Sequence, residues 1–478
     1  MKRFLALFLA MLLLLSGCAG NTQTTEQTVS APVSGTEDAP KDIRLAVETA
    51  AGFDPYHCQS TCNRLVLELV LQPLFTVSAT GEAMPVLAKG WSVSPDGMTT
   101  TVYLREDVVF HDGRPLTAGE VVSSVEKAKN GTYYAGRFRY VTEVTAPNAV
   151  TAVFKTEKPY ECLPRLLDIP IVTGSGPRPV GTGPYRFAGA NGLRRASQWQ
   201  EEYPCPAEEI AFVPVSGAME LRDGFQYSGI SAAMLDPNEP SALAYNGEHA
   251  LWSVPTSILQ YVGFNLRSGP FADGGLRSAV TYAIDREAIV LEDMGGAAVA
   301  APTGTLPGWD TYSADLAAKV TYTPKKLRDL GWQTPEGVTY TMLVSEPGSQ
   351  RNRSAQRIAD ALNDCGIAVT VKALRQEEFR TAMYNGEYDL YYTEVRLPSD
   401  LDLSVLFEDL GYGGLRSQEG IGALCDLTRA NAGNAYDLQR AILMDGLICP
   451  IAFKQMELYI HRDVLQGVSP KLGGWILQ

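Results

Sequence analysis

The sequence predicts a mixed α/β protein with more than one domain. Three observations support this prediction. Strand and helix patterns alternate from residue 340 to residue 396, a second strand–turn–helix stretch spans residues 74–129, and the chain has 478 residues. Alternating strands and helices are typical of sheets covered by helices. A chain of this length is too long for one hydrophobic core, so we expect two or three domains.

The strongest fold signal is the alternation in residues 340–396. Strands are expected at residues 340–344, 367–371 and 388–395, and helices at residues 355–362 and 377–384. Gly366 and Gly386 follow the two helical segments, where a glycine commonly ends a helix. The β-α-β-α-β order favours a parallel sheet with helices packed over it.

The stretch from Leu74 to Lys129 contains clear turn and cap signals. Asp96-Gly97 is a tight-turn dipeptide, and residues 99–104 have the β-branched and aromatic character of a strand. Thr117 and Glu120 have the spacing of a capping box, in which each side chain bonds the backbone N–H of the other. We therefore expect a helix to begin at this point.

Shorter segments complete the predicted secondary structure. We expect a first strand at Ile43–Val47, a helix at Asn63–Leu71, a strand at Tyr261–Asn265 and a helix that carries the apolar residues Leu276 to Ile284.

The N-terminus has the pattern of an export signal. Lys2 and Arg3 precede an apolar run from residue 4 to residue 15, which is too short to span a bilayer as a mature helix. Leu15-Ser16-Gly17-Cys18 then has the form of a bacterial lipobox. We expect residues 1–17 to be a signal peptide and Cys18 to carry lipid. A plain signal peptide or a short anchor is the alternative.

Composition limits the remaining possibilities. Residues 18–42 are poor in large apolar residues, so we expect a flexible tether behind Cys18. The net charge of −14 argues against nucleic acid as a partner. Beyond the N-terminal run, no apolar segment approaches the length of a membrane span.

The eight cysteines do not predict a metal site or a dense disulfide scaffold. Seven remain after lipidation of Cys18, which is an odd number. His57, Cys58 and Cys62 are the one cluster of soft ligands, and on a helix the two cysteines would share a face. A structural zinc site needs four ligands, so a disulfide or two thiols is the preferred interpretation. Cys365 is expected to be a small core residue.

Several strings of residues resemble one known family. They are P-x-L-A-x-x-W-x-x-S-x-D-G at residues 85–97, L-R-x-x-V-x-F-x-D-G-x-P-x-T-A-x-x-V at 104–121, V-G-T-G-P-Y at 180–185, and G-F-N with L-R-x-A-x-x-Y-A-I-D-R-E at 263–287. The chain resembles the peptide/nickel-binding family (family 5) of ABC-importer solute-binding proteins over nearly its whole mature length, with residues 186–253 as the weak part.

The resemblance implies a periplasmic-binding-protein-like fold, with two lobes around a ligand cleft and an extra small α+β domain. On this basis we expect main domain I in residues 43–75, 174–260 and 451–478, small domain II in residues 76–173 and domain III in residues 261–450. Closure of the lobes over a ligand is the form that the importer's membrane subunits would recognise.

The expected ligand site lies after the last strand of residues 340–396. Ligands of open α/β sheets bind beyond the carboxyl ends of the strands. Tyr392, Glu394 and Arg396 alternate along that strand and so share one face. The resemblance adds Asp400, because in the family an acidic residue of this loop can hold a peptide's amino group. The loop differs from the usual Asp-x-x-Asp-Pro, and a solvated loop is the alternative.

The resemblance implies a substrate-binding lipoprotein of an ABC importer. It would capture a peptide or similar small ligand, act as a monomer with permease and ATPase subunits, and be anchored by lipid to the outer face of the cytoplasmic membrane, in the periplasm of a Gram-negative cell. A ligand-binding sensor and a nickel or metal-chelate binding protein are the alternatives. No Gly-x-Ser-x-Gly, His-Glu-x-x-His or P-loop string occurs, so we expect no enzyme activity and no cofactor.

Overall fold

The computed structural model describes residues 43–174, 176–199, 207–227, 229–238, 249–345, 349–461, 468–471 and 474–477. The predicted signal peptide, the predicted lipidation site Cys18, the tether and Cys205 lie outside these residues. No helix in the described ranges is long and apolar enough to cross a membrane.

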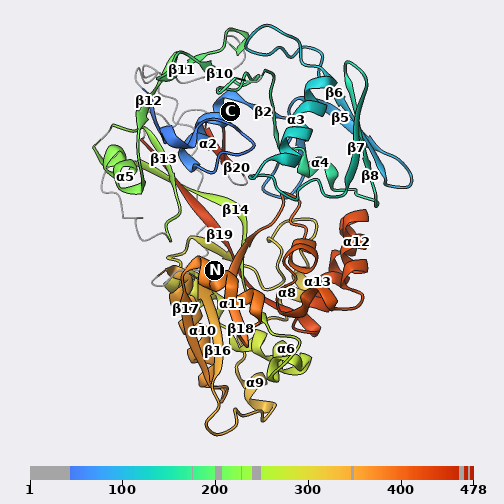
Figure 1. Cartoon of the computed structure of the whole chain (residues 1–478), viewed down its shortest axis with the longest axis vertical. Helices are drawn as coiled ribbons and strands as arrows, with labels where there is room; N and C mark the ends of the chain where they lie inside the picture. The colour runs from blue at the N-terminus through green and yellow to red at the C-terminus, as the bar shows by residue number, and fades with distance from the viewer. Residues whose placement is uncertain are drawn as a thin grey trace, which may run out of the picture. The chain divides into compact units, whose positions relative to one another are not determined.

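Two long antiparallel strands form the centre of the main sheet. β14 (His249–Phe264) and β19 (Ile448–His461) pair from His249 opposite His461 to Gly263 opposite Ile448. In the described part of the chain the sheet has eleven strands, and it continues from β19 to β13 and from β14 to β18. Figure 1 shows β14 and β19 side by side between these two groups. The predicted strand at Tyr261–Asn265 is therefore only the end of a longer one.

The first lobe is the part of the sheet that contains the first predicted strand. β1 (Ile43–Val47) has the predicted bounds and pairs in parallel with β12 (Glu209–Pro214) and β13 (Ala232–Leu235). The predicted helix at Asn63–Leu71 is α2 (Thr61–Val70), which starts earlier because the Ser60 side chain caps it. The lobe also contains β10 (Tyr185–Phe187), β11 (Gly192–Arg195) and α5 (Ala218–Gln226).

The small α+β domain is a four-stranded antiparallel sheet that packs against one helix. Its strand order is β5 (Ala88–Val93), β6 (Thr99–Leu104), β8 (Thr151–Thr156) and β7 (Val141–Asn148). β6 has the predicted bounds. The predicted capping box is present at the start of α3 (Ala118–Asn130), where Thr117 N donates to Glu120 Oε2 at 3.2 Å. Val121 and Val125 of α3 are fully buried.

The second lobe contains the predicted β-α-β-α-β unit. It runs β16 (Tyr340–Ser345), α10 (Gln350–Asn363), β17 (Val369–Leu374), α11 (Gln376–Asn385) and β18 (Leu390–Arg396), and β16 pairs in parallel with both other strands. The predicted parallel pairing is confirmed for these three strands. Beyond the unit, β18 pairs antiparallel with β14, so the whole sheet is mixed. Helices α6 (Gly274–Ala283), α12 (Ile421–Ala430) and α13 (Ala435–Met444) complete the lobe.

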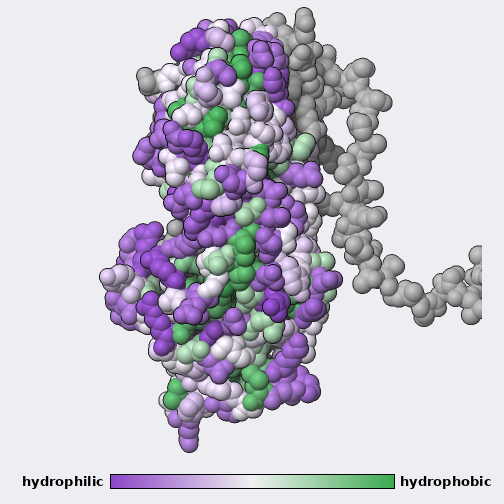
Figure 2. Space-filling view, turned by 90° about the vertical axis from the view of Figure 1, so that its right-hand side faces the viewer, coloured by the Kyte–Doolittle hydropathy of each residue, from purple (hydrophilic) through white to green (hydrophobic). Residues whose placement is uncertain are grey.

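Burial follows the predicted apolar patterns. Separate clusters of buried apolar residues lie under α2 and α3, between α10 and β16, and around β18 and α13. The face drawn in Figure 2 is mostly hydrophilic, with hydrophobic residues gathered in a patch near its middle. Hydrophilic residues thus dominate this face, while the core clusters are apolar.

The described cysteines are buried thiols. Cys58, Cys62, Cys162, Cys365, Cys425 and Cys449 form no disulfide with one another. Cys58 lies before the first residue of α2, so the hypothesis that it shares a helical face with Cys62 is wrong. Cys365 is 2% exposed in the core of the second lobe, which confirms its prediction as a core residue. Within the described ranges, no group of three or more His, Cys, Asp or Glu side chains is placed to hold a metal ion.

The string Val180–Tyr185 has a packing role in the structure. Gly183 N donates to Val70 O at 2.9 Å, and Gly183 O lies 2.8 Å from His111 Nε2. A methyl group on Gly183 would lie 2.6 Å from Leu69 O, and one on Gly181 would lie 2.1 Å from Val70 O. The two glycines therefore allow this segment to approach the backbone at the end of α2.

We expect Gly183→Ala to destabilise the protein, because the new methyl group meets main-chain atoms that cannot move aside. Overpacking of this kind costs about 1–3 kcal/mol. The loss is measured as a lower midpoint of guanidinium-induced unfolding. Gly217→Ala is the matched control, since Gly217 has an extended backbone and nothing within 4 Å of the new methyl group. Equal midpoints for the two variants would contradict this role for Gly183.

Candidate functional site

Tyr392 and Glu394 are held by contacts within the protein. Tyr392 is fully buried, and its hydroxyl donates to Gln260 Oε1 at 2.7 Å. Glu394 lies 2.7 Å from Arg351 Nη1 and 3.4 Å from Lys454 Nζ. Burial alone would raise the pKa of Glu394, but the two cations outweigh it and lower that pKa below its usual value. The contacts of Tyr392 and Glu394 thus fix the end of β18 to neighbouring parts of the protein.

Lys454 connects this carboxylate to the first lobe. It is buried on β19, where its Nζ lies 2.5 Å from Asp236 Oδ2 as well as 3.4 Å from Glu394. Asp236 directly follows β13 of the first lobe, whereas Glu394 belongs to β18 of the second. One buried ammonium group therefore joins the two lobes beside the long strands.

Asp400 is buried away from Arg396. Its side chain accepts hydrogen bonds from Tyr160 Oη at 2.7 Å and from the Asp402 backbone N–H at 3.1 Å. No ion pair joins Asp400 to any residue that the structure describes, and in particular it does not pair with Arg396. The two charged residues of the predicted loop site thus face different surroundings.

Arg396 lies at the end of β18 and is exposed. Its guanidinium carbon is 5.9 Å from the centre of the Tyr133 ring, a cation–π distance. With the described residues it makes no hydrogen bond and no ion pair. This cationic side chain is available to an additional partner.

A cavity of about 90 Å³ lies beside Arg396. Its wall combines parts of the chain from the first lobe, the small domain and the second lobe. The polar side chains among its lining residues are Arg64, Glu68, Thr76, Tyr133, Tyr134, Arg137, Asp168, Ser257, Arg396 and Ser399. The cavity thus lies where the first lobe, the small domain and the second lobe meet.

Two further arginines of the cavity are engaged by neighbouring side chains. Arg64 lies over the Tyr133 ring at 3.4 Å and donates to Tyr134 Oη at 3.1 Å. Arg137 forms an ion pair with Asp168, and the same carboxylate accepts a hydrogen bond from Ser399 Oγ at 2.5 Å. Aromatic rings and one carboxylate therefore fix these two cations in the wall.

The sequence interpretation missed Arg64, Tyr133 and Arg137. A usable signal existed for the first, because Arg64 and Glu68 are the two charged residues of α2 and stand four positions apart. Tyr133 and Arg137 follow α3 in an irregular segment, and no sequence pattern places that segment next to β18.

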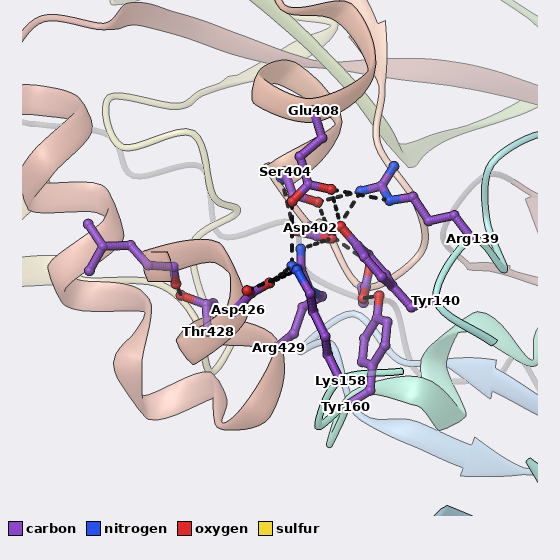
Figure 3. A network of polar contacts seen from close by, with 12 residues as sticks. Arg139, Tyr140, Lys158, Tyr160, Asp402, Ser404, Glu408, Asp426, Thr428 and Arg429 are labelled. Carbon is purple, nitrogen blue, oxygen red and sulfur yellow. Dashed lines mark hydrogen bonds and ion pairs between the residues drawn. The ribbon is translucent and has the colours of Figure 1, made fainter. Parts of the chain in front are cut away.

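A second polar cluster joins the small domain to the second lobe (Figure 3). From the small domain, Arg139 Nη2 lies 3.4 Å from Asp402 Oδ2 and Lys158 Nζ lies 3.0 Å from Asp426 Oδ2. On the other side, Arg429 is nearly inaccessible and lies 3.1 Å from Asp402 Oδ2. The view shows these side chains converging from both sides of the interface. They form an inter-lobe ion network that connects the small domain to the second lobe.

Comparison with known proteins identifies the family. Residues 82–404 match the model of the bacterial extracellular solute-binding proteins, family 5 (middle). The glutathione-binding protein GsiB of Salmonella typhi is 29% identical over 363 residues, which cover 70% of each chain.

Solved structures share the fold. The ABC transporter substrate-binding protein CtaP of Listeria monocytogenes superposes with a TM-score of 0.72 at 19% identity, covering 92% of this chain and 100% of that one. A nickel ABC transporter protein of Bacillus halodurans gives the same TM-score and identity, covering 89% and 96%. With more than half of its length matched by the family model, this chain belongs to family 5 of the bacterial extracellular solute-binding proteins and is a substrate-binding protein of an ABC importer.

Proposed function

We propose that this protein captures a small ligand bearing a carboxylate, such as a short peptide, in the cavity beside Arg396 and delivers it to the importer's permease and ATPase subunits. The observation that carries the proposal is the guanidinium of Arg396, which has no hydrogen bond or ion pair with the described residues although it lines the inter-lobe cavity. A guanidinium can bind a carboxylate through two parallel hydrogen bonds.

The charges of the cavity wall support this choice of ligand. Asp168 neutralises Arg137, and Glu68, which also lines the cavity, acts on the charge of Arg64. Arg396 is contacted by the Tyr133 ring, so three arginines face two carboxylates in this wall. Tyr392, Glu394 and Asp400 bond within the protein, so among the four predicted site residues we assign direct ligand contact to Arg396. An anionic group is the partner that this wall favours.

The size of the cavity favours a compact ligand. A buried water needs about 10–15 Å³ on this measure, so about 90 Å³ accommodates roughly six to nine water-sized atoms. That is the scale of an amino acid or a dipeptide fragment. A longer peptide would need a more open arrangement of the lobes.

The names of relatives agree with a ligand that carries carboxylates. GsiB is a glutathione-binding protein, and glutathione is a small peptide with two carboxylates. NikZ of Campylobacter jejuni is described in complex with Ni(L-His), and L-histidine also has a carboxylate. A metal chelate is therefore the second candidate, since Arg396 would bind its carboxylate in the same way.

Membrane attachment through Cys18 is part of the proposal. The lipobox pattern at Leu15–Cys18 and the composition of residues 18–42, which predicts a tether, support it. A lipid on Cys18 would hold the protein at the outer face of the cytoplasmic membrane, next to its permease.

We expect Arg396→Ala to weaken ligand binding at least tenfold, because the ligand carboxylate would lose its charged partner. Tenfold corresponds to about 1.4 kcal/mol. The ligand is first identified by mass spectrometry of what co-purifies, and its affinity is then measured by calorimetric titration. The affinity of Arg396→Lys should lie between those of the unchanged protein and Arg396→Ala, since a lysine keeps the charge but cannot form the paired hydrogen bonds.

Arg375→Ala is the control for this experiment. Arg375 is also an arginine of the second lobe, with an 81% exposed side chain that pairs only locally with Glu378. The Arg375→Ala variant should bind the ligand with the same affinity as the unchanged protein. An Arg396→Ala affinity within threefold of that value would rule out the proposed contact.

Lobe closure should depend on the inter-lobe ion network. Removing both Arg139 and Lys158 by alanine substitution deletes the cations that the small domain contributes to Asp402 and Asp426. In small-angle scattering without ligand, we expect this double variant to have a larger radius of gyration than the unchanged protein. Lys155→Ala is the control, since Lys155 pairs with Glu143 inside the small domain. If the double variant and Lys155→Ala have the same radius of gyration, the network does not hold the lobes together.

Cys18→Ala should abolish lipid attachment. Cells that express the unchanged protein should incorporate a palmitate analogue into it, and cells that express the variant should not. Equal labelling of the two proteins would exclude a lipid at Cys18.

A further inference from the structure

A second, smaller cavity lies where the loop after β18 meets α12 and α13. Its volume is about 30 Å³, and it is separate from the cavity beside Arg396. Its lining residues include Asp400, Thr311 and Gln439 of the second lobe and Cys162 of the small domain. Burial raises the pKa of the Cys162 thiol to about 12, so this thiol adds no charge to the cavity.

Asp400 brings a buried carboxylate to this cavity without a cationic partner. It is 6% exposed, and its hydrogen bonds come from Tyr160 Oη and the Asp402 backbone N–H. Burial, and then the neighbouring charge of Asp402, raise the pKa of Asp400. A buried charge normally pairs with an opposite charge or binds an ion. The surroundings of Asp400 thus leave a place for a positive group.

Two neutral oxygens on the same cavity also lack partners. Gln439 is 1% exposed and Thr311 is 8% exposed, and neither Gln439 Oε1 nor Thr311 Oγ1 has a hydrogen bond with the described residues. The Nε2 of Gln439 donates to the backbone oxygen of Thr311, which assigns Oε1 to the other side of the amide. Unsatisfied buried acceptors are rare in native proteins, and each normally has an occupant nearby.

The charges around the cavity leave one carboxylate uncompensated. In the inter-lobe ion network of Figure 3, three cations pair with three carboxylates, namely Arg139, Lys158 and Arg429 with Asp402, Glu408 and Asp426. Arg165, the other cation close to Asp400, is paired with Asp310. Asp400 is the remaining carboxylate, so a single positive charge would balance the cluster.

We propose that this cavity binds one alkali-metal cation through the Asp400 carboxylate, Gln439 Oε1 and Thr311 Oγ1. Hard cations prefer oxygen ligands, and these three groups supply one negative charge and two neutral oxygens. A volume of about 30 Å³ holds roughly two or three water-sized particles, which fits one ion with one or two waters. The Nε of Arg429, which also lacks a partner, would donate to such a water.

The three ligands of the ion would all come from the second lobe, at the surface that meets the small domain. Asp400 is held by Tyr160, and Cys162 lines the same cavity, while Thr311 and Gln439 belong to the second lobe. Cation binding would therefore stabilise the second-lobe surface that carries Asp400, beside the inter-lobe ion network. This inference does not depend on which ligand the cavity beside Arg396 takes.

The first test compares melting temperatures of the purified full chain at pH 8 in sodium chloride, potassium chloride and choline chloride of equal concentration. A cation that binds only the folded state raises the melting temperature by mass action. We expect at least one alkali salt to give a value about 2 °C or more above that in choline. Equal values in all three salts would overturn the proposal, and a proton on Asp400 would then balance the charge.

Variants distinguish cation binding at this cavity from a general effect of salt on the melting temperature. Asp400→Asn removes the charge and Gln439→Met removes the amide oxygen at similar length, and each should abolish the difference between alkali and choline salts. Either variant suffices if the other fails to fold. Glu377→Gln is the control, because Glu377 is an 85% exposed carboxylate of the second lobe that lies outside the inter-lobe ion network and does not line the cavity. The control should keep the difference in melting temperature between alkali and choline salts. If Asp400→Asn and Gln439→Met also keep it, the site is refuted.

Crystals grown in rubidium chloride show directly whether a cation occupies the cavity. We expect an anomalous peak between Asp400 and Gln439. Its absence would refute the site. A peak without any difference in melting temperature would mean binding at crystal concentration only, which also contradicts the proposal.

Discussion

β14 and β19 exchange backbone hydrogen bonds over most of their length, and both lobes are built outward from this pair. β13 adds to β19 on one side and β18 adds to β14 on the other, so the end of β18 is positioned relative to the first lobe through four consecutive strands. Buried Lys454 adds a charge contact across the same region, between Asp236 and Glu394. The location of Arg396 follows from this pairing.

The surfaces that meet around the cavities are rich in charge, and nearly every charge is matched. Asp168 balances Arg137, and the inter-lobe ion network balances three cations with three carboxylates. Two groups depart from this rule. Arg396 has no anionic partner and Asp400 no cationic one among the described residues. An unpaired buried charge such as that of Asp400 is costly, and the exposed guanidinium of Arg396 can bind a carboxylate, so additional partners are expected at these two positions.

Much of the second lobe and the small domain could be predicted because the signals are local. Helical spacing, the capping box at Thr117 and the glycine after α11 depend on residues only a few positions apart. Predictions that needed distant partners were less accurate. The antiparallel pairing of β18 with β14 requires knowledge of a strand about 130 residues earlier, and the length of β14 depends on its pairing with β19.

The sequence by itself determined the family, the β-α-β-α-β unit and the candidate position of Arg396 at a strand end, because these follow from local patterns and from strings of consecutive residues. Only the tertiary structure decided that Arg396 lines a cavity with Arg64 and Arg137, while Asp400 is buried under Tyr160. The physical reason is that a side chain's partners are set by which chain segments meet in space, and the segment after α3 meets the end of β18 only once the lobes have packed together.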